Sequence, residues 1–306
     1  MKKKTLAFLL ALCMILGLAA CGSSQPAQGD SPDGAADADE QSAANTQDDA
    51  RSPANADEQT PDNTTDSSST ESDYAYVTGK GSLIVGITEF EPVDYQDADG
   101  NWIGFDADMA KKFAEEELGV DVQFQLIEWD NKVFELDGKT IDVVWNGMTL
   151  TDEVLSSMEC SNPYLKNAQV VVVKAADAEK YQTIDDVKSL SFAVESGSAG
   201  QEQAVENGLT FTEVTDQATA LLEVASGTAD AAIVDYLMAI AMTGEGTSYA
   251  DLTCTVSLNE EHYGVGFRKG SDLAALLNDF FTVAYDNGTM RETAETYGIA
   301  DALIAQ

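Results

Sequence analysis

Short apolar segments of strand length alternate with segments of helical periodicity over most of the chain, and this alternation constrains the fold more than any other feature. The strand-like segments lie at residues 82–87, 120–126, 141–145, 169–173, 190–194, 211–214, 230–234, 252–258 and 263–267. The helical segments lie at residues 105–118, 215–226, 273–285 and 289–297. Strands separated by helices predict parallel sheets. The series restarts after residue 173, so we expect an α/β protein with two lobes.

The stretch between residues 142 and 164 contains the clearest transition from strand to turn to helix. An apolar strand ends at Trp145, and Asn146-Gly147 follows, where glycine permits a turn or a close backbone approach. Thr151 is then a suitable N-cap for a helix. Ligands bind at the carboxyl ends of strands in open α/β sheets. The stretch is therefore either a ligand-binding turn or an ordinary connection, because such units recur in every α/β protein.

Residues 22–76 have a different composition from the rest of the chain. They hold 13 acidic residues against the single Arg51, four of the six prolines, and almost no large apolar residue before Tyr74. Such a segment cannot offset the entropy lost on ordering. We expect residues 21–76 to form a disordered tether of a length that suits a Gram-positive cell wall, and the folded part to begin at Val77.

The N-terminus has the pattern of an export signal. Three lysines, an apolar run at residues 6–18 and small residues before Cys21 predict a signal peptide over residues 1–20. Leu18-Ala19-Ala20-Cys21 resembles the lipobox of bacterial lipoproteins. This resemblance implies cleavage before Cys21 and a diacylglyceryl anchor on its sulfur, which holds the protein at the extracellular face of the cell membrane. A plain secretory signal with an incidental cysteine is the alternative.

Charge and cysteine content exclude several kinds of function. The formal net charge is −38, which argues against nucleic acid or an anionic membrane surface as a partner. With Cys13 removed and Cys21 lipidated, Cys160 and Cys254 remain in separate apolar segments, so we expect two free, buried thiols. Neither has the spacing of a metal site, and we expect no metal and no cofactor. The single His262 rules out most histidine-based catalysis.

Three further features point to a ligand at the strand ends. Residues 196–200, SGSAG, lie between a strand and a helix, where their amides and the Ser198 hydroxyl would form an anion nest. Asp235 ends an apolar strand, where its carboxylate either meets a cation such as an ammonium or caps the next helix. Phe90 and Trp129 each follow a strand end and either flank a ligand or belong to the core of a lobe.

A set of motifs occurs in a fixed order along the chain. They are GFDADMA at residues 104–110, NGMTLTDE at 146–153, SNPY at 161–164, SGS at 196–198, the pair Asp230 and Asp235, and YGVGFRKG at 263–270. From about Leu83 to Tyr297 the chain resembles the family 3 extracellular solute-binding proteins, the polar amino-acid receptors of ABC importers. The resemblance implies a two-lobed, type II periplasmic-binding-protein-like fold with two hinge strands and a ligand cleft between the lobes. It places lobe 1 at residues 77–168 plus 264–306 and lobe 2 at residues 169–263.

The same resemblance implies ligand-binding positions in the first lobe. Phe90 and Trp129 fall where aromatic side chains flank the ligand. Gly147 and Thr149 fall where the backbone and a hydroxyl contact it, and Asn146 adds polarity beside them.

In the second lobe, Ser198 and Ala199 fall where helix-start amides hold an α-carboxylate, and Asp235 falls where a carboxylate holds an α-ammonium. One position departs from the family, which usually has an arginine just after Thr-x-Glu to bind the α-carboxylate. Here that position is Val154. Losing a fork of charged donors weakens carboxylate binding. Either Thr149 and the amides at Ser198 hold the carboxylate alone, or the ligand lacks an α-carboxylate.

The sequence therefore predicts a lipid-anchored, non-enzymatic receptor of an ABC importer for an amino acid or a related small polar amine. Binding would shift the population toward a closed state of the two lobes. We expect a monomer that presents this closed state to a membrane permease and its ATPase. The alternatives are a solute-binding-fold enzyme, either dehydratase-like or peptidoglycan-cleaving, for which no paired acid and base are identifiable, and a sensor ectodomain.

Overall fold

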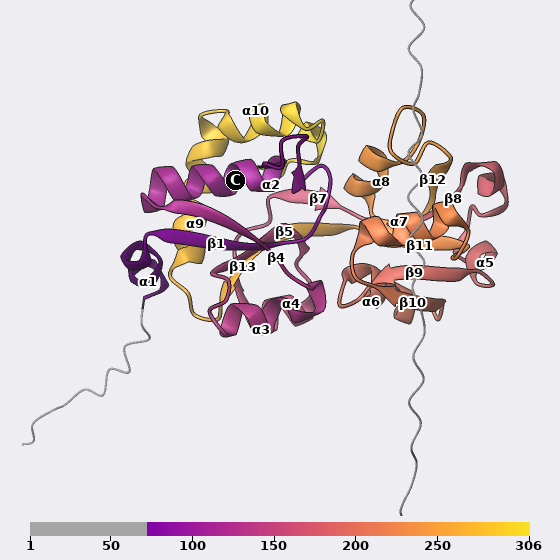
Figure 1. Ribbon diagram of the computed structural model, residues 1–306, viewed down its shortest axis with the longest axis horizontal. Coiled ribbons are helices and arrows are strands. Elements are labelled where there is room, and N and C mark those ends of the chain that lie inside the picture. The colour runs from indigo at the N-terminus through magenta and orange to yellow at the C-terminus, as the bar shows by residue number, and fades with distance from the viewer. Residues whose placement is uncertain (1–71) are drawn as a thin grey trace, which may run out of the picture. The chain divides into compact units, whose positions relative to one another are not determined.

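The computed structural model describes residues 72–306, all of which belong to one structural unit. Two β-sheets with helices packed against them form two lobes (Figure 1). Lobe 1 here means residues 72–168 and 261–306, and lobe 2 means residues 169–260. The predicted signal peptide, the predicted lipidation of Cys21 and the predicted tether before residue 72 lie outside the described residues. Within residues 72–306, no helix has the length and apolar character needed to cross a membrane.

The sheet of lobe 1 is built around the two buried strands β1 (Ser82–Ile87) and β5 (Val143–Thr149). The strand order is β4-β1-β5-β13-β6, with β4 (Asp121–Leu126), β6 (Met158–Cys160) and β13 (Glu261–Arg268). A further strand, β7 (Leu165–Asn167), also pairs with β13. A separate small hairpin joins β2 (Tyr95–Gln96) to β3 (Trp102–Ile103). The parallel strands β4, β1 and β5 therefore direct their carboxyl ends to one edge of this sheet.

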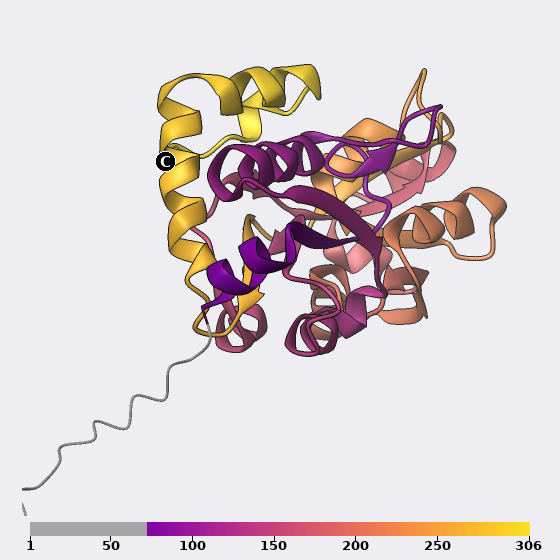
Figure 2. The same cartoon turned by 60° about the vertical axis from the view of Figure 1, so that its left-hand side comes forward.

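Helices cover the sheet of lobe 1 with apolar side chains. One layer holds α2 (Phe105–Lys112), which continues as the π-helical segment η1 (Phe113–Leu118), with α9 (Leu273–Asp286) and α10 (Thr289–Thr296). The C-terminal helices, yellow in Figure 2, pack against α2 and η1. Trp145 is fully buried and makes edge contacts with Phe113 and Phe281, so the strand before the predicted turn is fixed by this core. The lobe also contains four short helical segments: η2 (Trp129–Asn131), α3 (Lys132–Asp137), α4 (Asp152–Ser157) and η4 (Ala300–Ala302).

The sheet of lobe 2 has the order β10-β9-β11-β8-β12. Its strands are β8 (Gln169–Lys174), β9 (Ser191–Glu195), β10 (Thr210–Val214), β11 (Ala231–Asp235) and β12 (Leu252–Ser257). Its helical segments are η3 (Ala175–Lys180), α5 (Ile184–Val187), α6 (Ala199–Glu206), α7 (Gln217–Ser226) and α8 (Tyr236–Met242). Strands β9, β10 and β11 are parallel, so β9 and β11 bring Glu195 and Asp235 to the same edge.

Two strand predictions were wrong in detail. Both sheets are mixed rather than parallel, because β13 runs antiparallel to β5 and β8 runs antiparallel to β11. These two strands follow the passages between lobes, so no helical crossover forces a parallel direction on them. Strand β5 also does not stop at Trp145. It continues to Thr149 through Gly147, whose φ of +56° is accommodated beside a register shift in β13.

The chain passes between the lobes twice. It leaves the first sheet after β7 and enters β8 across Ala168, and it returns between Ser257 and Glu261. The second passage precedes the predicted change of lobe at residues 263 and 264, because β13 already pairs with β7 at Glu261. Three of the residues that flank the two passages are buried, namely Asn167, Gln169 and Glu261.

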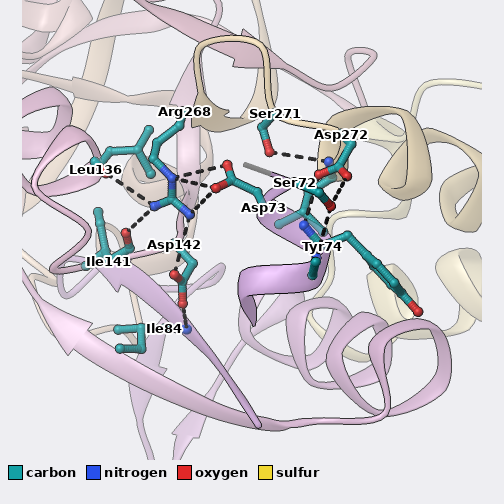
Figure 3. A network of polar contacts seen from close by, with 12 residues as sticks. Ser72, Asp73, Tyr74, Ile84, Leu136, Ile141, Asp142, Arg268, Ser271 and Asp272 are labelled. Carbon is teal, nitrogen blue, oxygen red and sulfur yellow. Dashed lines mark hydrogen bonds and ion pairs between the residues drawn. The ribbon is translucent and has the colours of Figure 1, made fainter. Parts of the chain in front are cut away.

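The folded part begins before Val77, so the prediction of a disordered tether is wrong for residues 73–76. Helix α1 (Asp73–Lys80) starts at an N-cap formed by Ser72, whose Oγ accepts the amide of Ala75 at 3.0 Å. The Asp73 carboxylate receives Nε of Arg268 at 2.9 and 3.1 Å, in a buried ion pair that spans 195 residues of sequence (Figure 3). This long-range charge pair fixes the start of α1, which composition alone does not show.

Asp142 belongs to the same network of charges. It is fully buried and accepts the ammonium of Lys80 at 2.5 Å and the amide of Ile84 at 2.8 Å. Its second oxygen lies 3.6 Å from the Arg268 guanidinium (Figure 3). Asp142 therefore ties α1 and β13 to the sheet and does not face the cleft.

The two cysteines of the described residues are free, as predicted, because Cys160 lies in β6 and Cys254 in β12 of the other sheet. Both are half-buried rather than buried. Burial raises the pKa of the Cys160 thiol to about 11, which makes it a poor nucleophile at neutral pH.

Candidate ligand-binding site

A cavity of about 580 Å³ lies between the lobes and is lined by residues of both. All eight residues predicted from the sequence line it: Phe90, Trp129, Asn146, Gly147, Thr149, Ser198, Ala199 and Asp235. They come from the carboxyl ends of β1, β4, β5 and β11 and from the start of α6, as expected for open α/β sheets. The fold therefore gathers the predicted residues, but their polar groups differ in how far they remain open to a ligand.

Two aromatic rings form part of the lobe 1 wall. Phe90 follows β1 and packs edge-on against Tyr263, with ring centroids 6.3 Å apart. Trp129 is the first residue of η2, and Nζ of Lys132 lies 4.9 Å from the centroid of the Trp129 ring. Both rings are almost fully buried. They can contact an apolar or cationic part of a ligand while they also belong to the core of the lobe.

Gly147 is required for the close packing under the cavity. A Cβ there would lie 2.7 Å from a ring carbon of Phe90 and 3.1 Å from the ring of Tyr263. Its amide donates to the buried Oδ2 of Asp106 at 2.7 Å. The predicted backbone contact of Gly147 with a ligand therefore does not use this amide, which is already bonded inside lobe 1.

Asn146 has a similar internal role. Its Oδ1 accepts the amide of Thr88 at 2.9 Å and the Thr88 hydroxyl at 2.7 Å. Its Nδ2 donates to the Thr88 carbonyl at 3.1 Å and to Asp94 at 2.8 Å. The side chain is thus fully bonded within lobe 1, and it shapes the cavity instead of adding a free polar group.

The lobe 1 side of the cavity offers little to a carboxylate. The Thr149 hydroxyl donates to Glu261 at 2.9 Å. Val154, where the resemblance to the family implied an arginine, lines the cavity, and Lys132 is the only basic side chain among the described lining residues. Nζ of Lys132 donates to the carbonyls of Trp129 at 3.2 Å and Gly197 at 2.9 Å. Burial lowers the pKa of this ammonium, although the nearby Glu195 carboxylate opposes the change.

The start of α6 supplies donors on the lobe 2 side. Ser198 is the N-cap, and its Oγ accepts the amide of Gln201 at 3.1 Å and donates to the carbonyl of Glu195 at 2.8 Å. The first amides of a helix have no partner within the helix, so those beginning at Ala199 remain suited to an anion. The Ser198 hydroxyl is bonded within the turn, so the predicted anion nest would have to be formed by these amides alone.

Asp235 is the most heavily bonded carboxylate of the cavity. Its Oδ1 accepts from Asn167, from Gln169 at 3.0 Å and from the Tyr263 hydroxyl at 2.6 Å, and its Oδ2 accepts from Gln217. It occupies the N-cap position of α8, but its side chain makes no capping hydrogen bond. Burial raises its pKa well above the usual range, and the Glu261 carboxylate adds to this. The structure therefore surrounds Asp235 with neutral donors.

Glu195 is a cavity residue that the sequence interpretation missed. It ends β9, is 2 % exposed, and its Oε1 has no hydrogen-bond partner within residues 72–306. Burial raises its pKa well above the usual range, and the neighbouring Asp235 carboxylate acts in the same direction. The signal was present, because Glu195 ends an apolar strand just as Asp235 does.

Acidic groups dominate the lining. Six acidic side chains face one basic one, Lys132, and the acidic ones are Asp130, Glu153, Glu195, Glu202, Glu206 and Asp235. Glu195 and Asp235 are buried, and the other four lie on exposed positions. Among residues 72–306, no group of three or more His, Cys, Asp or Glu side chains is placed to hold a metal ion. The arrangement suits a small organic ligand with positive charge better than an anion.

Two α/β lobes linked by two chain passages, with a lined cavity between them, define a solute-binding protein of the type II periplasmic class. The chain belongs to the bacterial extracellular solute-binding proteins, family 3, which match residues 83–300. The predicted family and the predicted two-lobed fold are thereby confirmed.

Several characterised proteins are similar to this chain. The L-cystine-binding protein TcyJ of Escherichia coli strain K12 is 30% identical over 229 residues, which are 74% of this chain and 85% of TcyJ. The arginine-binding extracellular protein ArtP of Bacillus subtilis is 28% identical over 224 residues, 70% of this chain and 85% of ArtP. A substrate-binding protein of an ABC uptake transporter from Streptococcus pneumoniae, solved with bound histidine, has a TM-score of 0.68 and 28% identity. The match covers 75% of this chain and 98% of the Streptococcus pneumoniae chain.

An enzyme is also among the relatives. The cyclohexadienyl dehydratase of Pseudomonas aeruginosa is 25% identical over 118 residues, which are 38% of this chain and 44% of the enzyme. The relatives are thus mainly amino-acid-binding proteins.

Proposed function

We propose that this protein is a lipid-anchored receptor that captures an amino acid or a related small polar amine for an ABC importer. The observation that carries the proposal is the cavity between the lobes, lined by Phe90 and Trp129 on one side and by the α6 start and Asp235 on the other. Family membership and the cystine-, arginine- and histidine-binding relatives support it.

Ligand capture would proceed by closure of the lobes. The cavity is shared by both lobes, so a ligand that contacts both stabilises the closed arrangement and shifts the population toward it. Contacts that already cross the cleft include the bond from Lys132 to the Gly197 carbonyl. The closed monomer is then the form that a permease and its ATPase would recognise. Isolation of the full chain with its permease would support this partner, and isolation with a signalling protein instead would favour a sensor.

Native mass spectrometry of freshly purified protein tests the ligand class directly. We expect an excess mass that matches an amino acid or a small amine and disappears after dialysis in mild denaturant and refolding. Calorimetry of the refolded protein with the released compound should restore binding. A released compound of another class, such as a sugar or a metal chelate, would contradict the proposal.

Attachment at Cys21 is a separate part of the proposal, and it rests on the lipobox-like sequence at residues 18–21. Replacement Cys21→Ala should move the protein from the membrane fraction to the medium, since a multi-chain acyl anchor is needed for stable attachment. Cys160→Ala is the matched control, because Cys160 lies in β6 of the folded part. Equal membrane retention of both variants would contradict lipid attachment.

Dehydratase activity is the second candidate, favoured by the dehydratase relative and by a buried Glu195 that holds a proton more firmly than an exposed glutamate. The proposed receptor has no turnover. Incubation with cyclohexadienyl compounds should therefore return the starting material unchanged, and formation of a dehydrated product would favour the enzyme.

A further inference from the structure

Glu195 has a buried carboxylate oxygen with no hydrogen-bond partner among the described residues. The residue is 2 % exposed, lines the cavity at the end of β9, and its Oε1 has no hydrogen-bond partner among the described residues. Its carboxyl group lies near Gln217, Asp235 and Lys132, which all line the same cavity. Gln217 hydrogen-bonds the carboxyl group, but a buried carboxylate oxygen without a partner is unfavourable, so the group either holds a proton or receives a cation.

Asp235 differs from Glu195 in this respect. Four side-chain donors already occupy its two oxygens, and its own amide donates to Oε1 of Gln217 at 2.8 Å. A carboxylate offers about four acceptor positions in total. An arriving ammonium or guanidinium therefore finds free acceptor capacity at Glu195 and little at Asp235.

Lys132 does not remove this capacity. Two of its three N–H groups are directed to the carbonyls of Trp129, in the same lobe, and of Gly197, in lobe 2. The other charged side chains of the lining are acidic. A ligand carboxylate would thus meet one ammonium and the start of α6, whereas a ligand cation would meet Glu195 within an acidic cavity.

We propose that Glu195 binds the positively charged group of the ligand and that the cavity selects ligands with net positive charge. The proposal rests on the receptor function above and narrows its ligand class. The shared chemistry is an ammonium or guanidinium on an aliphatic stem, carried either by a basic amino acid or by its decarboxylated amine. The rings of Phe90 and Trp129 supply the apolar wall for such a stem.

Calorimetry of the full-length protein against a charge-graded panel tests the proposal. The panel holds arginine and lysine, agmatine and cadaverine, neutral glutamine and cystine, and anionic glutamate. We expect at least one net-positive compound to bind at least about tenfold more tightly than every neutral or anionic one. Binding limited to amines would identify the decarboxylated class, and binding limited to arginine or lysine would identify the amino acids.

Glu195→Gln keeps the shape of the side chain and removes its charge. We expect it to weaken binding of the preferred cation by at least about a hundredfold, as when a buried charge pair loses one partner. Glu179→Gln is the matched control at an exposed position of lobe 2 outside the lining, and it should weaken binding by less than about threefold. Equal, small losses in both variants, or a wild type that prefers neutral compounds, would overturn the role of Glu195.

The pH dependence of the wild type gives a second measurement that needs no variant. Burial and the carboxylates of Asp235 and Asp216 raise the pKa of Glu195, while Gln217 and Lys132 lower it. A cation must displace the proton that Glu195 then holds, so affinity for the cation should rise with pH from 5 to 8. An affinity that stays constant over this range would overturn the proposal. Failure of every panel compound to bind the wild type would overturn the receptor function itself, which distinguishes the two.

Discussion

The ammonium of Lys132 donates to the carbonyl oxygen of Gly197 at 2.9 Å, and this bond joins helix α3 of lobe 1 to the turn before α6 of lobe 2. The lobes are close at this point, because a Cβ on Gly197 would lie 2.8 Å from the Cα of Asp130. The contact lies beside the cavity, which both residues line. Lys132 and Gly197 therefore hold the two lobes together beside the cavity through this hydrogen bond.

Replacing Lys132 with methionine should favour the open arrangement. The side chain keeps its length but loses the charged donor, and a hydrogen bond to a charged group contributes about 1.5–3 kcal/mol. Small-angle scattering of ligand-free protein should show a larger radius of gyration than in the wild type. Lys188→Met, on the exposed surface of lobe 2, is the control. Identical scattering of the Lys132 and Lys188 variants would show that the bond does not hold the lobes.

Gly197→Ala should open the lobes by steric contact and weaken ligand binding. The new Cβ would meet the Asp130 backbone, and the φ of +70° adds strain of about 1–2 kcal/mol. Gly208→Ala separates the two effects, since its φ is +65° and nothing lies within 4 Å of the new Cβ. Both variants should lose similar thermal stability, but only Gly197→Ala should lose affinity in calorimetry. Equal affinity losses would contradict a contact between the lobes at this point.

Removal of residues 73–76 should destabilise the folded part without changing ligand affinity. A chain that begins at Val77 leaves Arg268 buried without Asp73, and breaking a buried ion pair costs about 3–5 kcal/mol. A chain that begins at Ser72 keeps the pair. Denaturant unfolding of the two chains, with Asp73→Asn in the longer one, measures the difference. The chain that begins at Ser72 should unfold at a higher denaturant concentration than the chain that begins at Val77. Equal unfolding midpoints would mean that the ion pair between Asp73 and Arg268 adds nothing to stability.

The buried carboxyls under the cavity make stability depend on pH. Burial raises the pKa of Asp106 from 3.8 to about 7, and burial together with the Asp106 charge raises that of Asp94. The folded protein thus holds a proton on Asp106 that the unfolded chain releases near pH 4. The stabilising contribution of the protonated Asp106 to the free energy of unfolding is fully present below pH 4. It is lost as pH rises to about 7, by up to about 1.4 kcal/mol per pH unit.

Asp106→Asn mimics the protonated form and can still accept the bonds from the Tyr164 hydroxyl and the Gly147 amide. We expect the variant to gain stability over the wild type between pH 5 and pH 8, measured as the free energy of unfolding in urea. Asp99→Asn, on an exposed turn, should change little at either pH. A stability difference between Asp106→Asn and the wild type that does not grow with pH would contradict the raised pKa.

Val154→Arg should separate amino acids from amines. For a basic amino acid, the new guanidinium supplies the missing donor for the α-carboxylate and should tighten binding by about 1.5–3 kcal/mol. For the corresponding amine, it adds a like charge to the cavity and should weaken binding. Calorimetry with arginine and agmatine compares an amino acid and an amine that share the same aliphatic stem. A shift of both ligands in the same direction would show that position 154 does not face the carboxylate.

Local sequence patterns predicted much of this structure. The alternation of apolar strands and helices determined an α/β protein with two lobes, because burial of both sheet faces needs long apolar strands and covering helices. The rule that strand ends of open sheets form sites selected Phe90, Trp129 and Asp235, and all three line the cavity. The same rule applied to β9 would have selected Glu195.

Only the tertiary structure decided which polar groups remain open to a ligand. Asn146 and Gly147 looked available in the sequence, but Thr88, Asp94 and Asp106 use their hydrogen bonds. The carboxylate of Asp235 likewise accepts hydrogen bonds from residues up to 68 positions away. The start of α1 depends in the same way on Arg268, at a separation of 195 residues. Propensity and periodicity act over a few neighbouring residues, whereas the partners of buried polar groups are set by contacts between segments distant in sequence. For that reason the sequence determined which residues surround the cavity, and the packing of the two lobes decided that Oε1 of Glu195 has no hydrogen-bond partner among the described residues.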